Sequence, residues 1–266
     1  MEQFIHQNNA CPQCGYQRSW KLRRGTRKCK GCRKEWSPRR RIRGFRSSYE
    51  EWKEVISVFL RDHTILKVSE VTEKERHVIQ RMVARIRKSM MEDTPGCFSG
   101  TVEMDETYIG GKWINKPAWI RKRGTKKGHG TSKQAIFGIL NRNGRQVRVF
   151  LVSNFKEETI FTIISSVVKK KSKAYTDGYA IYKPLRAYGY DHHVVDHAHG
   201  EYVRGDIHTN TIESFWGYLK KRLSVTGGIR PAYFNRFVGE LVWRYNHRHM
   251  SREEQVEILL KRLVDG

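Results

Sequence analysis

Residues 101–112 read TVEMDETYIGGK, and this stretch decides how the second half of the chain folds. Val102 and Met104 alternate with Glu103 and Asp105, which is the period of two expected for a β-strand with one buried face. The strand pattern ends at a pair of glycines. Asp105 is therefore predicted to project from a rigid sheet.

The pattern after this strand predicts a mixed α/β domain. Apolar runs at residues 135–140 and 147–152 flank a segment with an Asn-Gly pair, which favours a tight β-hairpin. A helix and two short strands are then expected, at residues 157–170, 174–179 and 192–196. A further helix begins near Ile207. This order is that of a ribonuclease H-like fold, a mixed five-stranded sheet with helices.

Three carboxylates are predicted to converge in this domain. Asp105 lies on the first strand, Asp177 ends the fourth, and Glu213 lies on the following helix. Three carboxylates in one cleft would repel one another unless cations lay between them, and hard oxygen ligands suit Mg²⁺ or Mn²⁺. Two such ions support in-line phosphodiester displacement. Trp216 and Lys220 share a helical face with Glu213, so the Lys220 ammonium group could hold a phosphate.

The composition is strongly basic. Lys and Arg number 52 against 27 Asp and Glu among 266 residues, which gives a formal charge of +25 and a pI of about 10.1. Such a charge predicts a polyanionic partner, here double-stranded DNA. No apolar run approaches the roughly 18 residues that suggest a membrane span, and the N-terminus does not resemble a signal peptide. We therefore expect a cytoplasmic, nucleoid-associated protein.

Two Cys-x-x-Cys pairs lie near the N-terminus, in the segment CPQCGYQRSWKLRRGTRKCKGC. The four residues are Cys11, Cys14, Cys29 and Cys32. Two such pairs joined by a short hairpin predict a tetrahedral structural Zn²⁺ site, a zinc ribbon. Disulfides are the alternative, which a reducing cytoplasm disfavours. Basic residues and Trp20 crowd the ribbon, so we expect it to contact DNA phosphates as well. Cys97 has no partner motif and is predicted to be a packing residue.

The segment between the ribbon and the α/β domain is predicted to be helical. Apolar residues recur at helical spacing, first at Tyr49, Trp52, Val55, Ile56 and Phe59, then at Val78, Ile79, Met82, Val83 and Ile86. Thr72 and Glu75 fit a capping box at the start of a long basic helix. A helix-turn-helix that lays this helix on DNA is expected, with an ordinary helical bundle as the alternative.

The predicted domains follow from these patterns. They are a zinc ribbon with a basic tail (1–45), a helix-turn-helix-like DNA-binding region (46–92), a linker (93–100) and a ribonuclease H-like catalytic domain (101–266). The basic loop at 112–133 is expected to grip DNA. Glu106 should point to the opposite face from Asp105 and pair with a basic group.

Four histidines cluster near the end of the last predicted strand, at His192, His193, His197 and His199. We expect them to lie near DNA, with His197 as a helper at the active site. A second metal site is the alternative.

The zinc-ribbon segment is followed by MDETYIGGK (104–112), YTDGY (175–179), HTNTIESFWGYLKK (208–221) and FVGELVWRYNHR (237–248). Together these motifs resemble the DDE transposases of bacterial insertion sequences, specifically the ISXO-like group, over nearly the whole chain. The resemblance implies a ribonuclease H-like catalytic domain, two-metal hydrolysis at the transposon ends, and transfer of the freed 3′-hydroxyl into target DNA.

The resemblance also implies residue roles. Asp105 and Asp177 match the first two acids, Asn210 with Glu213 matches the third motif, and Lys220 matches the trailing basic residue. An Asn replaces the acidic third ligand in parts of this group, so Asn210 remains an alternative to Glu213.

The sequence therefore predicts a transposase that acts in DNA recombination as a homodimer or a larger synaptic assembly, since two ends must be held together. A structure-specific nuclease of the same fold and a non-catalytic DNA-binding regulator are the alternatives.

Overall fold

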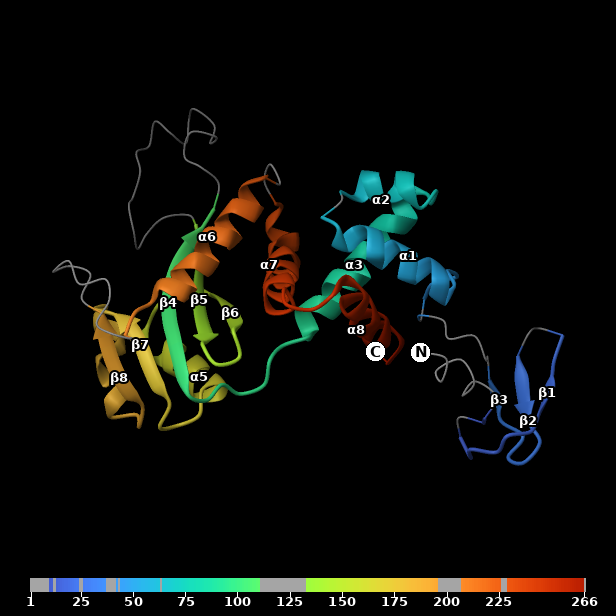
Figure 1. Cartoon of the computed structure of the whole chain (residues 1–266), viewed down its shortest axis with the longest axis horizontal. Coiled ribbons are helices and arrows are strands. Elements are labelled where there is room, and N and C mark those ends of the chain that lie inside the picture. The colour runs from blue at the N-terminus through green and yellow to red at the C-terminus, as the bar shows by residue number, and fades with distance from the viewer. Residues whose placement is uncertain are drawn as a thin grey trace. The chain divides into compact units, whose positions relative to one another are not determined.

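The structure is a computed structural model (Figure 1). It describes residues 10–11, 13–23, 26–36, 42, 44–62, 64–110, 133–195, 207–225 and 229–265. The chain divides into two compact units, one formed by Met1–Ser89 with Met250–Gly266 and the other by Met90–His249. In the described part of the chain, no helix is long and apolar enough to cross a membrane.

The N-terminal cysteine segment forms a small antiparallel sheet. Its strands are β1 (Ser19–Lys21), β2 (Arg27–Cys29) and β3 (Glu35–Trp36), in the order β1-β2-β3. Cys11 and Cys29 are buried, whereas Trp20 is 39% exposed. So small a sheet offers little apolar burial, as expected for a fold that depends on a metal ion.

Among the described residues, four helices complete the first unit. They are α1 (Tyr49–Leu60), α2 (Ile65–Val71), most of α3 (Arg76–Glu92), and α8 (Arg252–Asp265). The helix α8 packs on α1: the Arg252 guanidinium donates to the Leu60 carbonyl at 2.6 Å, and Lys53 pairs with Glu257. The predicted catalytic domain runs to residue 266, whereas the second compact unit ends at His249.

The predicted capping box at Thr72 is wrong. Thr72 is the C-cap of α2 and donates its hydroxyl to the Val68 carbonyl, and α3 begins four residues later at Arg76. The capping box lies instead at Ser48 and Glu51, at the start of α1. A Thr-x-x-Glu spacing suits the turn between two helices as well as a helix start, because a Thr hydroxyl can also bond the carbonyl four residues before it.

The second unit contains a mixed five-stranded sheet. Its strands are β4 (Thr101–Ile109), β5 (Gln134–Asn141), β6 (Gln146–Val152), β7 (Lys173–Asp177) and β8 (Asp191–Val195). The spatial order is β6-β5-β4-β7-β8, with β5 antiparallel to β4 and β6, and with β4, β7 and β8 parallel. This topology confirms the predicted ribonuclease H-like fold, with the Asp105 strand at the centre.

Helices cover both faces of this sheet. One face carries Met104 and Phe137 and packs on α5 (Glu157–Val167). The other face carries Ile136 and Leu140 and packs on two helices, α6 (Asn210–Val225) and α7 (Pro231–Asn246). Figure 1 shows α6 lying across β4 and β5. Because side chains alternate along a strand, Asp105 faces α6 while Met104 faces the α5 side.

Candidate active site and metal centre

Asp105 lies in the middle of β4 and is fixed by neighbours on the α6 side of the sheet. The indole Nε1–H of Trp216 donates to Asp105 Oδ2 at 2.9 Å. Across the ladder, Asp105 is directly opposite Gly138 of β5. The prediction that Asp105 lies on a strand of the sheet is therefore confirmed.

Asp177 is the last residue of β7, the strand parallel to β4. The register between the two strands pairs Thr101 with Lys173 and Glu103 with Tyr175. Asp105 and Asp177 each lie two residues beyond that last pair. Asp177 Oδ1 accepts a hydrogen bond from the backbone N–H of Tyr179 at 3.0 Å, which fixes the side chain at the strand end.

Glu213 lies in the first turn of α6 and is exposed. Its Oε1 accepts a hydrogen bond from the Thr209 hydroxyl at 2.8 Å. Asn210, the alternative to Glu213, is the first residue of the helix and is also exposed. Lys220 is exposed two turns after Glu213, whereas Trp216 on the same helix is buried against the sheet. Glu213 and Lys220 are therefore both exposed, whereas Trp216 faces the sheet.

The electrostatic environment of Asp105 includes both of the other predicted carboxylates. Burial raises the pKa of Asp105 to about 6; hydrogen bonds from the Glu106 N–H and the Trp216 indole oppose this rise, and the charges of Asp177 and Glu213 add to it. Both neighbouring carboxylates therefore act on the same group. This is the mutual repulsion expected of converging acids.

The donor set suits a hard divalent cation. Three carboxylates supply only oxygen ligands, and a cation among them would relieve their repulsion. Among the residues that the structure describes, only the four N-terminal cysteines form a group of three or more His, Cys, Asp or Glu side chains already close enough to hold an ion. Asp105, Asp177 and Glu213 each accept a hydrogen bond through one carboxylate oxygen: Oδ2 of Asp105, Oδ1 of Asp177 and Oε1 of Glu213.

Glu106 lies on the opposite face of β4, as predicted, but the prediction that it pairs with a basic group is wrong. Its Oε2 accepts a hydrogen bond from the hydroxyl of Tyr182, which is buried. Burial raises the pKa of Glu106 to about 7; the Tyr182 hydrogen bond lowers it, and the charges of Asp177 and Asp105 raise it further. A basic partner was expected because carboxylates usually pair with cations, yet this face is covered by the apolar core under α5.

Glu103 is the functional candidate that the sequence analysis missed. Its side chain is fully buried and accepts a hydrogen bond from the backbone N–H of Ile212 at 2.8 Å, in the first turn of α6. Arg142 Nε donates to the other oxygen at 2.5 Å, and Arg142 also contacts the ring and carbonyl of His208. The sequence feature that could have identified Glu103 is its spacing: it lies two residues before Asp105, on the same face of a strand whose two faces are both covered.

The histidine cluster is only partly described. His192 is buried and bonds the Thr176 hydroxyl through Nε2 at 2.9 Å; burial, followed by the charges of Arg186 and His193, lowers the pKa of His192 to about 4. His193 Nε2 lies 3.0 Å from Asp191 Oδ1. His197 and His199 lie outside the described residues, as does the predicted DNA-gripping loop at 112–133 apart from its last residue, Lys133.

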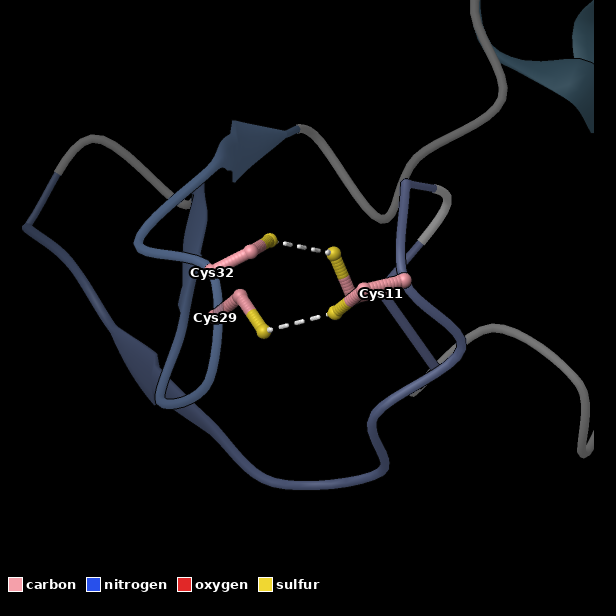
Figure 2. A group of neighbouring side chains, drawn as sticks. Cys11, Cys29 and Cys32 are labelled. Atoms are coloured by element: carbon pink, nitrogen blue, oxygen red, sulfur yellow. Dashed lines mark hydrogen bonds between the residues drawn. The ribbon is translucent and has the colours of Figure 1, made fainter.

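The four N-terminal cysteines face one another from two knuckles of the ribbon (Figure 2). The sulfur atoms of Cys11 and Cys32 are 3.4 Å apart, and those of Cys14 and Cys29 are 3.6 Å apart. Zn–S bonds of about 2.3 Å in a tetrahedron place sulfur atoms about 3.8 Å apart. The geometry therefore fits Zn²⁺ with only small side-chain movements.

Two further predictions, one for Cys97 and one for the ribbon surface, have different outcomes. Cys97 is exposed, so its predicted packing role is wrong; its thiol points to the Ser166 carbonyl at 3.7 Å. On the ribbon surface, the Arg33 guanidinium and the Lys30 ammonium group lie 4.8 and 5.5 Å from the ring centre of Trp20. This exposed aromatic with two cations is compatible with contact to a nucleic acid.

A ribonuclease H-like sheet with one carboxylate on its central strand, one on the neighbouring strand and one on a covering helix is typical of a class of nucleic-acid-cleaving enzymes. Within this class the chain belongs to the family described as the ISXO2-like transposase domain, whose family model matches residues 97–246, more than half of the chain. The predicted family is therefore confirmed.

Two curated relatives support the same assignment. An uncharacterized transposase-like protein of Haemophilus influenzae is 30% identical over 121 residues, which cover 46% of this chain and 95% of that protein. An uncharacterized protein in transposable element ISH50 of Halobacterium salinarum is 30% identical over 158 residues, covering 57% of this chain. The match covers 53% of that protein, so this chain spans about half the length of the Halobacterium relative.

Some solved structures resemble this chain at much lower sequence identity. The HTLV-2 integrase catalytic core, solved in complex with magnesium, is 13% identical with a TM-score of 0.33, covering 56% of this chain and 87% of that one. The BIV integrase catalytic core is 12% identical with a TM-score of 0.33, covering 55% and 82%. These likenesses are too distant to add to the argument from sheet topology.

Proposed function

We propose that this protein is the transposase of an insertion sequence, which binds the ends of its element, cleaves DNA there and joins the freed 3′-hydroxyl to target DNA. The observation that supports this proposal is the placement of Asp105, Asp177 and Glu213 in the fold. They lie on β4, β7 and α6 of a ribonuclease H-like domain whose chain belongs to a transposase family. The charges of Asp177 and Glu213 both raise the pKa of Asp105.

Asp105, Asp177 and Glu213 would hold Mg²⁺ or Mn²⁺, since all three offer hard oxygen ligands. When bound, such ions activate the attacking water or 3′-hydroxyl and stabilise the leaving oxygen. Asp105 is the most firmly oriented of the three, because it is held on a central strand by the Trp216 indole. Asn210 is the alternative third ligand.

Lys220 would orient the DNA. It is exposed on α6 two turns beyond Glu213, where its ammonium group would contact a phosphate next to the cleaved bond. This contact fixes the position of the scissile phosphate and needs no change in the charge of the lysine.

The ribbon and the helical region would recognise the element ends. The four cysteines would hold a structural Zn²⁺, and the surrounding basic residues would neutralise DNA phosphates. Because one reaction joins two ends, we propose that the protein works as a homodimer or a larger synaptic assembly. A cytoplasmic, nucleoid-associated location follows from this DNA substrate.

Separate measurements of cleavage and binding test this function. Asp105→Asn and Asp177→Asn should each abolish Mg²⁺-dependent cleavage of a labelled duplex that carries the element end, and should leave the binding of that duplex within about twofold of wild type. Asp191→Asn is the matched control, since Asp191 is an exposed acid of β8 paired with His193, and it should retain both. Cleavage by either active-site variant would contradict the proposal, as would a wild-type protein that binds DNA and never cuts, which is the result expected of a regulator.

A further inference from the structure

The helix α6 is attached to β4 by two carboxylates on the same face of the strand. Glu103 accepts from the backbone N–H of Ile212, and Asp105 accepts from the indole of Trp216, at 2.8 and 2.9 Å. Glu213 lies between these two attachment points in the sequence of the helix. Its height above the sheet and its rotation about the helix axis are therefore set by contacts to the strand that carries Asp105.

The indole of Trp216 reaches Asp105 because the opposite strand has no side chain at that position. Gly138 is the ladder partner of Asp105, and a Cβ atom on Gly138 would lie 2.6 Å from both Cζ2 and Cη2 of Trp216. Such a distance is far inside van der Waals contact. Trp216 is 3% exposed, so the glycine provides the space in which its ring lies against the sheet.

We propose that Trp216 is a positioning residue for metal binding: its N–H holds Asp105 Oδ2 while its ring, seated on Gly138, keeps Glu213 beside Asp105. This inference rests on the proposed function and deepens it. A hydrogen bond to a ligating carboxylate fixes the orientation of the ligand, and loss of such a partner typically lowers metal affinity or activity by about 10–100-fold.

Ordinary packing is the competing explanation, because a buried indole N–H finds some acceptor in most proteins. The same unit supplies the matched case. Trp243 of α7 is fully buried and donates from Nε1 to Asp93 Oδ2 at 2.8 Å, in a pair that lies outside the carboxylate cluster. If Trp216 only packs, the two tryptophans should respond alike to the loss of their N–H.

The experiment compares Trp216→Phe with Trp243→Phe. Phenylalanine retains an aromatic ring and removes the donor, so both variants should lose similar, modest amounts of thermal stability. Binding of Mn²⁺ to the full zinc-loaded chain, without DNA, is measured by electron paramagnetic resonance of the free ion, and the binding that Asp105→Asn removes defines the site. We expect Trp216→Phe to weaken that binding about 10–100-fold and Trp243→Phe to leave it unchanged.

The outcomes separate this inference from the proposed function. Equal Mn²⁺ affinity in Trp216→Phe and wild type overturns the positioning role, as does an equal loss in both tryptophan variants. If wild type binds Mn²⁺ through Asp105 but does not cleave DNA, the proposed function fails, and weaker binding in Trp216→Phe still supports the positioning role. Absence of Asp105-dependent binding in wild type would overturn both.

Discussion

Replacement of Glu103 by Gln should loosen the start of α6. The carboxylate is fully buried, and it receives one bond from Arg142 Nε at 2.5 Å and another from the Ile212 N–H at 2.8 Å. A glutamine keeps one oxygen acceptor but turns an NH₂ group toward a second donor. The substitution therefore removes the charge and leaves one buried donor unpaired.

The expected cost follows from that geometry. Hydrogen bonds to charged groups contribute about 1.5–3 kcal/mol each, and breaking a buried ion pair costs about 3–5 kcal/mol. Since the glutamine retains one of the two bonds, we expect a loss of about 3 kcal/mol in the free energy of unfolding of the second unit. For a domain of this size, 1 kcal/mol lowers Tm by about 2–4 °C, so the shift should be about 6–12 °C.

Two measurements check this prediction. Thermal unfolding gives the overall loss, and amide hydrogen exchange at Ile212 reports the start of α6 directly. Glu257→Gln is the control, because it removes the same charge from an exposed pair with Lys53, which is expected to be worth less than about 1 kcal/mol. The reasoning is refuted if Glu103→Gln has the same Tm as wild type and its Ile212 amide is as well protected from hydrogen exchange as in wild type.

Three further predictions concern the carboxylate, its glycine neighbour and the ribbon. Folding raises the pKa of Asp105 from 3.8 to about 6, so the folded state disfavours the ionised form of this carboxyl. The protein therefore becomes less stable as pH rises from about 4 to about 6 and Asp105 ionises. Without divalent metal, Asp105→Asn should therefore be more stable than wild type by up to about 3 kcal/mol at pH 8 and equally stable near pH 4, as measured by denaturant unfolding; equal stability at both pH values would contradict this. Gly138→Ala should displace Trp216 from the sheet and lower both Tm and Mn²⁺ affinity, and a fully active, equally stable variant would show that the ring is not confined there. Cys29→Ser should release zinc, measured with a chromogenic chelator, and weaken binding to the element end; retained zinc and unchanged specificity would remove the ribbon from end recognition.

Local sequence patterns were sufficient to predict the sheet. The alternation around Asp105 identified β4, and the Asn-Gly segment at 143–144 identified the hairpin of β5 and β6, because both signals arise from residues that are near one another in the chain. The spacing of the cysteines predicted their gathering for the same reason, since a Cys-x-x-Cys pair forms half of a metal site by itself.

Contacts between distant parts of the chain were not predictable in the same way. Glu103 is 109 residues from Ile212, so its role in holding α6 could not be inferred until the helix was placed on the sheet. The partner of Glu106, Tyr182, lies 76 residues away. Thr72 shows the limit of local motifs, because the same Thr-x-x-Glu spacing occurs where one helix ends and the next begins.

The most direct test of the central claim is an assay with purified protein, a labelled duplex carrying the element end and a supercoiled target, in Mg²⁺ or in EDTA. Wild type in Mg²⁺ should cut at the 3′ end of the element and yield joined product, whereas EDTA and Glu213→Gln should each abolish both, and Asn210→Ala should retain both. Cleavage without joining would indicate a nuclease. Wild-type levels of joined product from Glu213→Gln would contradict the assignment of Glu213 as the third carboxylate of the site.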